Sequence, residues 1–388
     1  MIPVRDVVGL GAASERAVDT AVPIVRVALA EFDLPAPPPE VHAAAVRADA
    51  RTDPVRGWLV GVSDGDRWGF WGPIHVSVAR QVPAVVGAAL PLPGTADPAW
   101  FGRLLRRATR HAHTGLLAVA VGAVELALWD LAAKRAGLPV WRLLAPAAVA
   151  GPMPAYATCF GVRGDAARIA AVMDEVAGTY TVQKWDPAVL GDDLVDVTVD
   201  FVRRRGPGRL AVDFHGAWPA DRVRAACAPV AGGLAWVEEP YHPDEIDRAR
   251  PGEFGVAHAA GEHCYGGADT VQLREGRVDV WQPDAVFCGG LVSLLGIVHA
   301  ARAAGARCAP HGGGLLPALH LAVTGAPIDV LEFHLLLEPR RSLHLAGAPL
   351  PGGSDGPGAA PAGTLPVPTA PGWGGDLHAD LRLDLVDV

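Results

Sequence analysis

The pattern of apolar and polar positions from Met153 to about His334 predicts a parallel barrel. Eight short apolar runs occur there, near residues 153–160, 180–186, 209–214, 234–239, 256–262, 278–284, 306–311 and 328–333. The segments between them predict helices, which include residues 165–178, 192–205, 219–230 and 291–305. Apolar strands that alternate with helices are typical of a parallel sheet covered on its faces. Eight such units predict an α/β fold of the (β/α)8 type, a modified TIM barrel in which the last helix can be missing.

The residues before this region predict a separate α+β domain. Residues 22–29 and 58–62 are strand-like, and the second run is followed by an Asp64-Gly65 turn and a further strand-like segment. Two strands joined by an Asp-Gly turn are typical of an antiparallel hairpin. An apolar segment from about Thr114 to Ala136 has helical spacing and ends at Gly137-Leu-Pro139. We interpret this segment as a packing helix.

These patterns divide the chain into three parts. We expect an α+β capping domain over residues 1–115, and a barrel domain over 116–345 with its strands from about residue 153. Residues 346–388 form a Pro- and Gly-rich tail, extended to about residue 373, that returns to the capping domain. The alternating residues 381–386 predict a strand of that domain, and the Pro-rich residues 34–39 predict a surface connector.

Composition narrows the class of protein. Half of the residues are hydrophobic and 19% are charged, as in a compact soluble enzyme. The net charge of −9, with no Lys- or Arg-rich run, argues against a nucleic-acid partner. We expect no membrane partner, because the N-terminus lacks a signal-peptide pattern and no uninterrupted apolar run has the length of a membrane span. The five cysteines are odd in number and lack metal-site spacing, which indicates reduced thiols in a cytoplasmic protein: Cys159, Cys227, Cys264, Cys288 and Cys308.

Three acidic residues end three consecutive predicted strands. Asp213, Glu238 and Glu262 close the third, fourth and fifth apolar runs, and the carboxyl ends of parallel strands meet at one mouth of a barrel. Carboxylates that converge there repel each other unless a cation lies between them. Three oxygen donors suit a hard ion such as Mg²⁺. The alternative is that these are unrelated strand-end acids, each paired with a local arginine.

A lysine and a histidine flank the predicted metal site. Lys184 ends the second strand and can stabilise a developing oxyanion, although an exposed lysine at a strand edge fits the same pattern. His215 lies two residues after Asp213, so the alternation of a strand directs both side chains to the same face. An imidazole beside a metal ligand is a plausible acid or base, although a lone surface histidine is the common alternative.

The later strands also end on polar residues. Asp284 ends the sixth strand and His311 the seventh, so the two can form a carboxylate–imidazole pair in which the aspartate raises the basicity of the histidine. Glu332 closes the eighth strand, where it can bond a substrate oxygen or pair with a neighbouring histidine as a structural acid. The Gly312-Gly-Gly314 run after His311 matches no phosphate-loop pattern.

These groups together suit removal of a proton next to a carboxylate. Mg²⁺ and Lys184 would stabilise the enediolate that forms, and His311 would accept the proton. His215 would protonate a departing β-hydroxyl, which converts a hydroxy acid to a 2-keto acid. The expected partner is therefore a small-molecule carboxylate substrate.

The chain resembles the enolase superfamily, in its mandelate racemase/muconate lactonizing enzyme branch. Seven segments in order carry the resemblance: Glu125-Leu-Ala-Leu-Trp-Asp-Leu-Ala, Asp213-Phe-His-Gly, Glu238-Glu-Pro, Gly261-Glu-His, Gln282-Pro-Asp, Cys288-Gly-Gly-Leu and Pro310-His-Gly. The resemblance implies that Mg²⁺ is the cofactor, bound by Asp213, Glu238 and Glu262. It also implies that His311 with Asp284 is the base and that Glu332 is electrophilic. By analogy with such barrels we expect a homo-oligomer.

Within this branch, Asp213-Phe-His-Gly is similar to the motif of acid-sugar dehydratases of the galactonate type. The racemases carry Lys-x-Lys where this chain has Lys184-Trp-Asp186, and Ala217 stands where the galactonate-type motif commonly has arginine. The leading hypothesis is a Mg²⁺-dependent dehydratase of an aldonate or aldarate that yields a 2-keto-3-deoxy acid. The alternatives are a racemase, epimerase or cycloisomerase of the same superfamily, and a non-catalytic metabolite-binding barrel.

Overall fold

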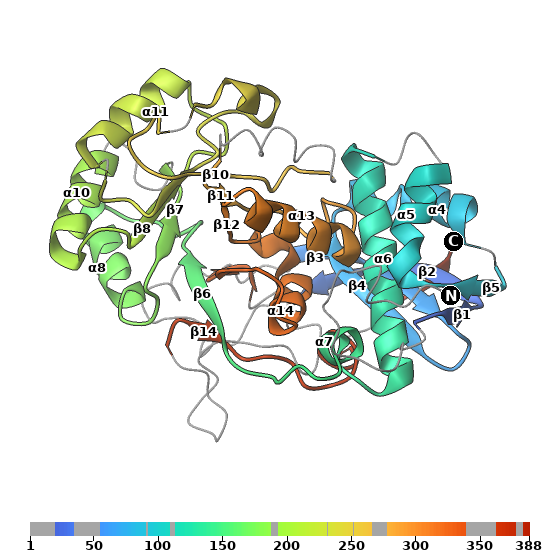
Figure 1. Ribbon diagram of the computed structural model, residues 1–388. Coiled ribbons are helices and arrows are strands. Elements are labelled where there is room, and N and C mark those ends of the chain that lie inside the picture. Colours follow the sequence, from blue (N-terminus) through green and yellow to red (C-terminus); the bar gives the residue numbers. More distant parts are fainter. Residues whose placement is uncertain are drawn as a thin grey trace.

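A computed structural model describes most of the chain, and its residues form a barrel and a capping domain (Figure 1). The described residues are 20–34, 55–90, 92–108, 113–187, 193–230, 232–250, 252–265, 278–338, 362–377 and 383–388. Residues 1–19 of the expected capping domain, most of the Pro-rich connector (34–39) and the first part of the tail (346–361) lie outside the described residues.

The capping domain contains an antiparallel sheet in the order β15-β2-β3-β4. These strands are β2 (Arg26–Leu34), β3 (Val55–Ser63), β4 (Trp68–Ile74) and β15 (Val386–Asp387). The Asp64-Gly65 turn joins β3 to β4, which confirms the predicted hairpin. The remaining elements before the barrel are β1 (Val22–Ile24), β5 (Gly94–Ala96), α3 (Val76–Ala79), α4 (Val82–Ala89), α5 (Pro98–Ala108), α6 (Gly115–Ala136) and α7 (Val140–Leu144).

Eight parallel strands form the curved sheet of the barrel. They are β6 (Met153–Thr158), β7 (Gln183–Trp185), β8 (Leu210–Asp213), β9 (Trp236–Glu238), β10 (His258–Ala260), β11 (Val280–Trp281), β12 (Arg307–Cys308) and β13 (Leu331–His334). They pair in chain order from β6 to β12, and β13 pairs with β6. The N–H of Asp329 donates a 2.8 Å hydrogen bond to the carbonyl of Cys308, so the two ends of the sheet meet. The predicted fold class, a modified TIM barrel with a capping domain, is confirmed.

The helices on the outer face of the barrel sheet agree with the helical segments predicted from the sequence. They are α8 (Ala166–Val176), α10 (Leu194–Arg205), α11 (Ala220–Cys227), α13 (Leu291–Ala303) and α14 (Leu315–Val323), with 3-10 turns η3 (Ala228–Val230), η4 (Pro243–Arg248) and η5 (Gly312–Gly314). Each of the four predicted helices is present with somewhat shorter limits. The segment from 339 to 361, where an eighth helix would follow β13, lies outside the described residues.

Helix α6 is the central packing element between the capping sheet and the barrel (Figure 1). It begins after Thr114 and ends at Gly137, whose φ of 67° is the left-handed conformation that glycine adopts readily. The helix is long and apolar enough to cross a membrane, but 89% of its apolar window is buried inside the protein. It is therefore a core helix, as the sequence predicts.

The buried Asp130 of α6 holds the C-terminal segment against this helix by hydrogen bonding. Asp130 accepts hydrogen bonds from the backbone N–H groups of Phe70 in β4 (2.8 Å) and Trp373 (2.9 Å). Its charge is balanced by Lys134, whose Nζ lies 2.7 Å away. After β14 (Thr364–Leu365) pairs with β6, the chain passes α6 and ends as β15 on the capping sheet. The C-terminal segment thus completes the capping domain, as predicted for this fold.

Candidate active site

The three predicted metal ligands converge at the carboxyl ends of neighbouring strands. Asp213 is the last residue of β8 and Glu238 the last of β9, and the two are direct partners in the parallel register. Glu262 follows β10 by two residues. One carboxylate oxygen from each of the three lies within 4.8 Å of the others. The barrel therefore brings together acids that are far apart in the sequence.

The donor set fits a divalent cation. All three ligands are carboxylates, which suit Mg²⁺. Oδ2 of Asp213 is buried and accepts no hydrogen bond from the residues that the structure describes, and its contact with Lys184 is a longer ion pair of 3.4 Å, so this oxygen can serve a metal ion. Burial raises the pKa of Asp213 to about 6 despite Lys184, and the charge of Glu262 adds to the rise. A cation among these carboxylates would remove the repulsion that disfavours their charged forms.

Lys184 lies inside the site rather than at an exposed strand edge. Its side chain is 1% exposed, and Nζ is 2.5 Å from Glu238 Oε1, 3.1 Å from Glu332 Oε1 and 3.4 Å from Asp213 Oδ2. Burial alone would lower the pKa of Lys184, but Glu238 and Glu332 raise it well above its usual value. The lysine therefore stays positively charged among the carboxylates.

His311 and Asp284 form the predicted carboxylate–imidazole pair. Nδ1 of His311 is 2.9 Å from Oδ2 of Asp284, and the other oxygen of Asp284 accepts hydrogen bonds from the N–H groups of Val286 and Phe287. The carboxylate is thus fixed by backbone donors and fixes the ring in turn. Nε2 of His311 lies 3.5 Å from Oε2 of Glu262, so the ring extends from Asp284 to the carboxylate triad.

The pKa of His311 depends on these neighbours. Burial alone would lower it, but the negative charge of Glu262 and the hydrogen bond with Asp284 raise it to about 10. A cation bound to Glu262 would neutralise much of that charge and lower the pKa of His311 toward the range of a general base.

The glycine run after His311 allows the loop to pack tightly on the site. A Cβ at position 313 would lie 2.2 Å from Oδ2 of Asp284, and one at 314 would lie 2.6 Å from the Cβ of Ala285. The N–H of Gly312 donates to Oε2 of Glu332 (2.9 Å), while the hydroxyl of Thr158 donates to Oε1 (2.5 Å). Burial would raise the pKa of Glu332, but Lys184, His311 and the Thr158 hydroxyl lower it, which favours the ionised form in the metal-free site. Among the described residues, its hydrogen-bond and ion-pair partners are Lys184, Thr158 and Gly312 rather than a histidine.

His215 lies beside the triad, although not for the reason that strand alternation suggests. Strand β8 ends at Asp213, and His215 has a φ of 50°, so it belongs to a turn. Its N–H donates to Oδ1 of Asp213 (2.9 Å), and its ring nitrogen Nδ1 is 3.4 Å from the same oxygen. The other ring nitrogen, Nε2, is 3.9 Å from Oδ2 of Asp186. The side chain is 40% exposed and packs edge-on against Phe160.

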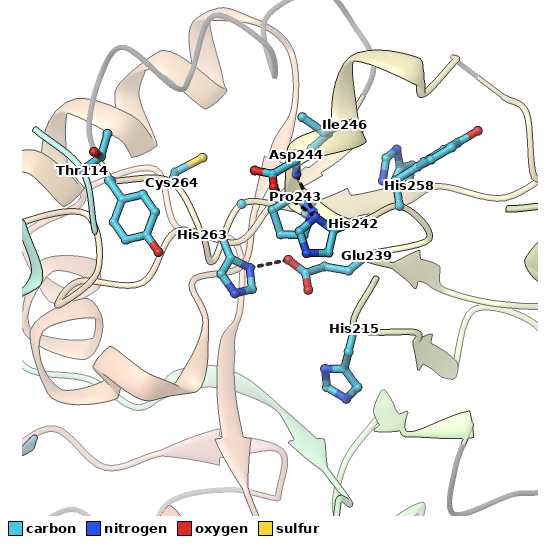
Figure 2. Close-up of a pocket in the computed structure, with 14 residues that line it drawn as sticks. Thr114, His215, Glu239, His242, Pro243, Asp244, Ile246, His258, His263 and Cys264 are labelled. Carbon is cyan, nitrogen blue, oxygen red and sulfur yellow. Dashed lines mark hydrogen bonds and ion pairs between the residues drawn. The ribbon is translucent and has the colours of Figure 1, made fainter. Parts of the chain in front are cut away.

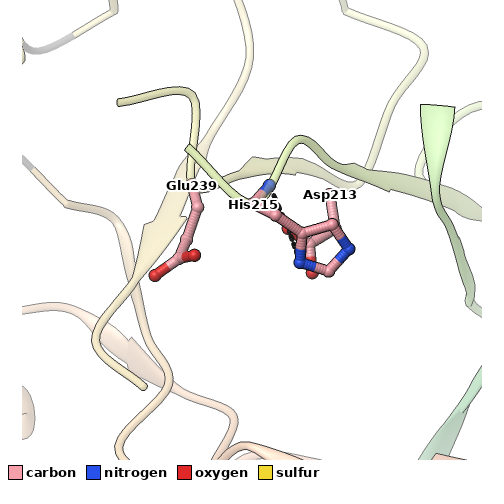
Figure 3. Close-up of side chains that lie close together, drawn as sticks. All are labelled: Asp213, His215 and Glu239. Atoms are coloured by element: carbon pink, nitrogen blue, oxygen red, sulfur yellow. Dashed lines mark hydrogen bonds and ion pairs between the residues drawn. The ribbon is translucent and has the colours of Figure 1, made fainter. Parts of the chain in front are cut away.

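A pocket of about 580 Å³ opens next to the triad (Figure 2). Its lining contains two residues to which the sequence pattern assigns no role, Glu239 and His263, joined by a 2.8 Å contact between Oε1 and Nδ1. Figure 3 shows that the side chain of Glu239, which follows β9, is directed to the same side of the chain as those of Asp213 and His215. Alternation would turn Glu239 away from Glu238, but its φ of 39° takes it out of the strand. The available sequence signal was the doubled acid in Glu238-Glu-Pro.

The fold and this site define a barrel with a carboxylate triad and a histidine–aspartate pair at one mouth. Residues 165–381 match the family described as enolase C-terminal domain-like, and residues 58–145 match the mandelate racemase/muconate lactonizing enzyme N-terminal domain. The chain belongs to the enolase superfamily, and the predicted mandelate racemase branch is confirmed.

Solved structures with low sequence identity share this fold. A putative isomerase from Sinorhizobium meliloti is 23% identical over 94% of this chain and 100% of its own, with a TM-score of 0.73. An L-talarate dehydratase from Polaromonas sp. JS666, complexed with Mg and L-glucarate, is 23% identical over 95% and 99%, with a TM-score of 0.68. A racemase from Streptomyces coelicolor A3(2) with bound magnesium is 23% identical over 93% and 97%, with a TM-score of 0.67. The donor set of the triad in this chain fits the expected cofactor, Mg²⁺.

Proposed function

We propose that the protein is a Mg²⁺-dependent dehydratase of a sugar acid, an aldonate or aldarate. The observation that carries this proposal is the placement of two imidazoles around one carboxylate triad. His311 contacts Glu262, and His215 contacts Asp213. Dehydration needs a base for the proton next to the carboxylate and an acid for the departing β-hydroxyl, and these two rings can divide the roles.

The site residues would have separate roles in this reaction: binding the metal, transferring protons and stabilising negative charge. Asp213, Glu238 and Glu262 would hold the ion, which polarises the substrate carboxylate and lowers the cost of removing the neighbouring proton. His311 would accept that proton at Nε2, because its Nδ1 is held by Asp284. Lys184 adds a fixed positive charge where negative charge develops. Glu332, on the side of β13, would act as the electrophilic residue in its protonated form, because only a protonated carboxyl group can donate to a substrate oxygen. His215 would donate a proton to the leaving hydroxyl.

One contact favours epimerisation as a second candidate function. Nε2 of His215 lies 3.9 Å from Oδ2 of Asp186, so this ring also has a carboxylate partner. A second imidazole that is oriented by a carboxylate could return a proton to the opposite face of the substrate, and an epimerase requires such a second proton donor. The chain lacks the second lysine of the racemase pattern at Asp186, and His215 would have to replace it.

Incubation with aldonates and aldarates in D2O containing Mg²⁺ distinguishes these reactions. A dehydratase forms a 2-keto acid, which semicarbazide traps, whereas an epimerase exchanges the α-proton without forming one. In a dehydratase, His215→Asn should lose elimination and retain α-proton exchange. Equal loss of both activities would count against His215 as the acid. No turnover of any sugar acid, and no effect of EDTA, would support a non-catalytic barrel.

A further inference from the structure

A second group of potential metal ligands adjoins the triad. Glu239, Glu262 and His263 each offer one ligand atom, and these atoms lie within 4.8 Å of one another. Glu262 belongs to both groups, since the triad of Asp213, Glu238 and Glu262 meets the same limit. A carboxylate has two oxygens, so Glu262 can bridge two cations.

The donors of this second group differ chemically from those of the triad. His263 contributes an imidazole nitrogen, whereas the triad offers oxygen alone. Imidazole is a common ligand of transition-metal ions such as Zn²⁺, Fe²⁺ and Ni²⁺, whereas Mg²⁺ prefers oxygen donors. We propose that Glu239, Glu262 and His263 form a second divalent-cation site, selective for a transition metal and bridged to the first site by Glu262. This site is independent of the reaction proposed above, because it concerns metal binding without substrate.

The charge around the mouth supports a second cation. Six carboxylates gather there: Asp213, Glu238, Glu239, Glu262, Asp284 and Glu332. Among the described residues in contact with them, the groups able to carry positive charge are Lys184 and the rings of His215, His263 and His311. Lys184 contacts Asp213, Glu238 and Glu332, whereas Glu239 contacts the ring of His263 instead. A cation bound by Glu239, Glu262 and His263 would offset the part of this negative charge that Lys184 does not contact.

The pocket gives the second ion access to solvent. Glu239 is 4% exposed and lies between His263 and His215 on the wall of the cavity of about 580 Å³ (Figure 2). Glu239 also shares a three-ligand group with Asp213 and His215 (Figure 3). Imidazoles therefore lie on both sides of this carboxylate. The cavity has room for the water molecules that would complete the coordination of an ion.

Mn²⁺ titration of the metal-free protein tests this proposal, with calorimetry and electron paramagnetic resonance as readouts. The wild type should bind two equivalents, and the bridging carboxylate should place the ions close enough for their spins to couple, about 3.5–4 Å apart. Glu239→Gln and His263→Asn should each bind one equivalent with an uncoupled signal. His263 is partly exposed, so its replacement should leave the fold intact, which circular dichroism would verify.

His242→Asn is the matched control, because His242 lines the same pocket but belongs to neither ligand group and accepts from the N–H of Asp244. This variant should still bind two coupled ions. A wild-type protein that binds one equivalent would overturn the proposal and leave the Glu239–His263 contact as an ion pair only. A loss of coupling in His242→Asn equal to that in His263→Asn would also overturn it. Because no substrate is present, these outcomes do not depend on whether the protein is a dehydratase.

Discussion

At the scale of single residues, the proposed reaction depends on His311 as the group that accepts the proton. Replacing it with asparagine removes the base but keeps a side chain that can hydrogen-bond to Asp284. We expect α-proton exchange in D2O to fall by about 10²–10⁴-fold in His311→Asn, with the melting temperature nearly unchanged. Asp284→Asn keeps the ring but removes the charge that orients it, so it should show a smaller loss. Exchange at the wild-type rate in His311→Asn would contradict this role.

Lys184 has a role that depends on whether the metal is bound. It balances the charges of Asp213, Glu238 and Glu332 with an almost completely buried Nζ. We expect Lys184→Met to destabilise the metal-free protein by about 3–5 kcal/mol, because these charges lose their buried partner. Mg²⁺ would replace the missing charge, so it should raise the melting temperature of the variant more than that of the wild type.

The control for this experiment is Lys134→Met. Lys134 also has a side chain that is only 7% exposed, but it pairs with Asp130 in α6, away from the triad. Its loss should lower the melting temperature equally in EDTA and in Mg²⁺. An equal effect of Mg²⁺ on Lys184→Met and on the wild type would show that Lys184 is not part of the electrostatics of the metal site.

The predicted and observed positions of individual residues show which parts of this site can be located from the sequence. Asp213 and Glu238 end their strands as predicted, and Asp284 lies three residues beyond β11. Lys184 and Glu332 were predicted to end strands but lie within β7 and β13, each with its side chain in the site. Glu239 was missed because strand geometry directs consecutive side chains to opposite faces. A left-handed residue after the strand breaks that rule, and no apolar pattern reveals it. Strand alternation also predicted that His215 lies beside Asp213. The structure places it there, but through a turn after β8 and not through alternation within the strand.

At the scale of elements, the barrel strands are shorter than their apolar runs. The run of residues 278–284 gives only Val280–Trp281 as β11, and the run of 306–311 gives Arg307–Cys308 as β12. Pro283 and Pro310 have no N–H to donate to a neighbouring strand, so the regular ladder ends before them, although the N–H of His311 still donates to the carbonyl of Pro283 (3.2 Å). The apolar character continues beyond the pairing because these residues still face the core. Element order was therefore predictable, but strand limits were not.

The contact between α6 and the start of α13 joins the capping domain to the barrel. Glu125 of α6 accepts the N–H of Val292 at 3.1 Å. A Cβ at Gly122 would lie 2.5 Å from the carbonyl oxygen of Val286 and 2.9 Å from the nitrogen of Gly290. We expect Gly122→Ala to cost about 1–3 kcal/mol, since backbone atoms on both sides must shift, and thermal unfolding would measure this.

Gly296→Ala in α13 is the matched control. A Cβ at that position meets nothing within 4 Å, and alanine is favoured over glycine in a helix by roughly 1 kcal/mol. This variant should be as stable as the wild type or slightly more stable. If Gly122→Ala were equally stable, the close approach of α6 to the loop before α13 would not contribute to holding the two domains together.

At the scale of the whole molecule, a buried histidine links three distant segments. Nδ1 of His320 in α14 accepts the N–H of Trp141 in α7 (3.1 Å), and Nε2 donates to the carbonyl of Trp373 (2.9 Å). Burial lowers the pKa of this neutral ring to about 4. The unfolded chain, with a histidine pKa near 6.5, therefore binds the proton first as the pH falls.

The stability contributed by neutral His320 should be complete above about pH 6.5 and be lost between about pH 6.5 and 4. The loss should be on the order of 3 kcal/mol, from a shift of about 2.5 units at 1.36 kcal/mol each. Urea unfolding at several pH values would measure it. His320→Gln should be less stable than the wild type at pH 7 but lose less stability toward pH 4. Parallel pH curves for the two proteins would contradict this account.

The pairing of β15 with β2 also has a consequence for the order of folding. Strand β15 pairs with β2, and Asp387 contacts Arg26 across a separation of 361 positions in the sequence. Contacts between such distant residues require closure of a long loop, so we expect them to form after the local hairpin of the capping sheet. Until β15 docks, the edge of β2 is open to other chains, and opening of this strand alone would leave a folded barrel beside an aggregation-prone edge.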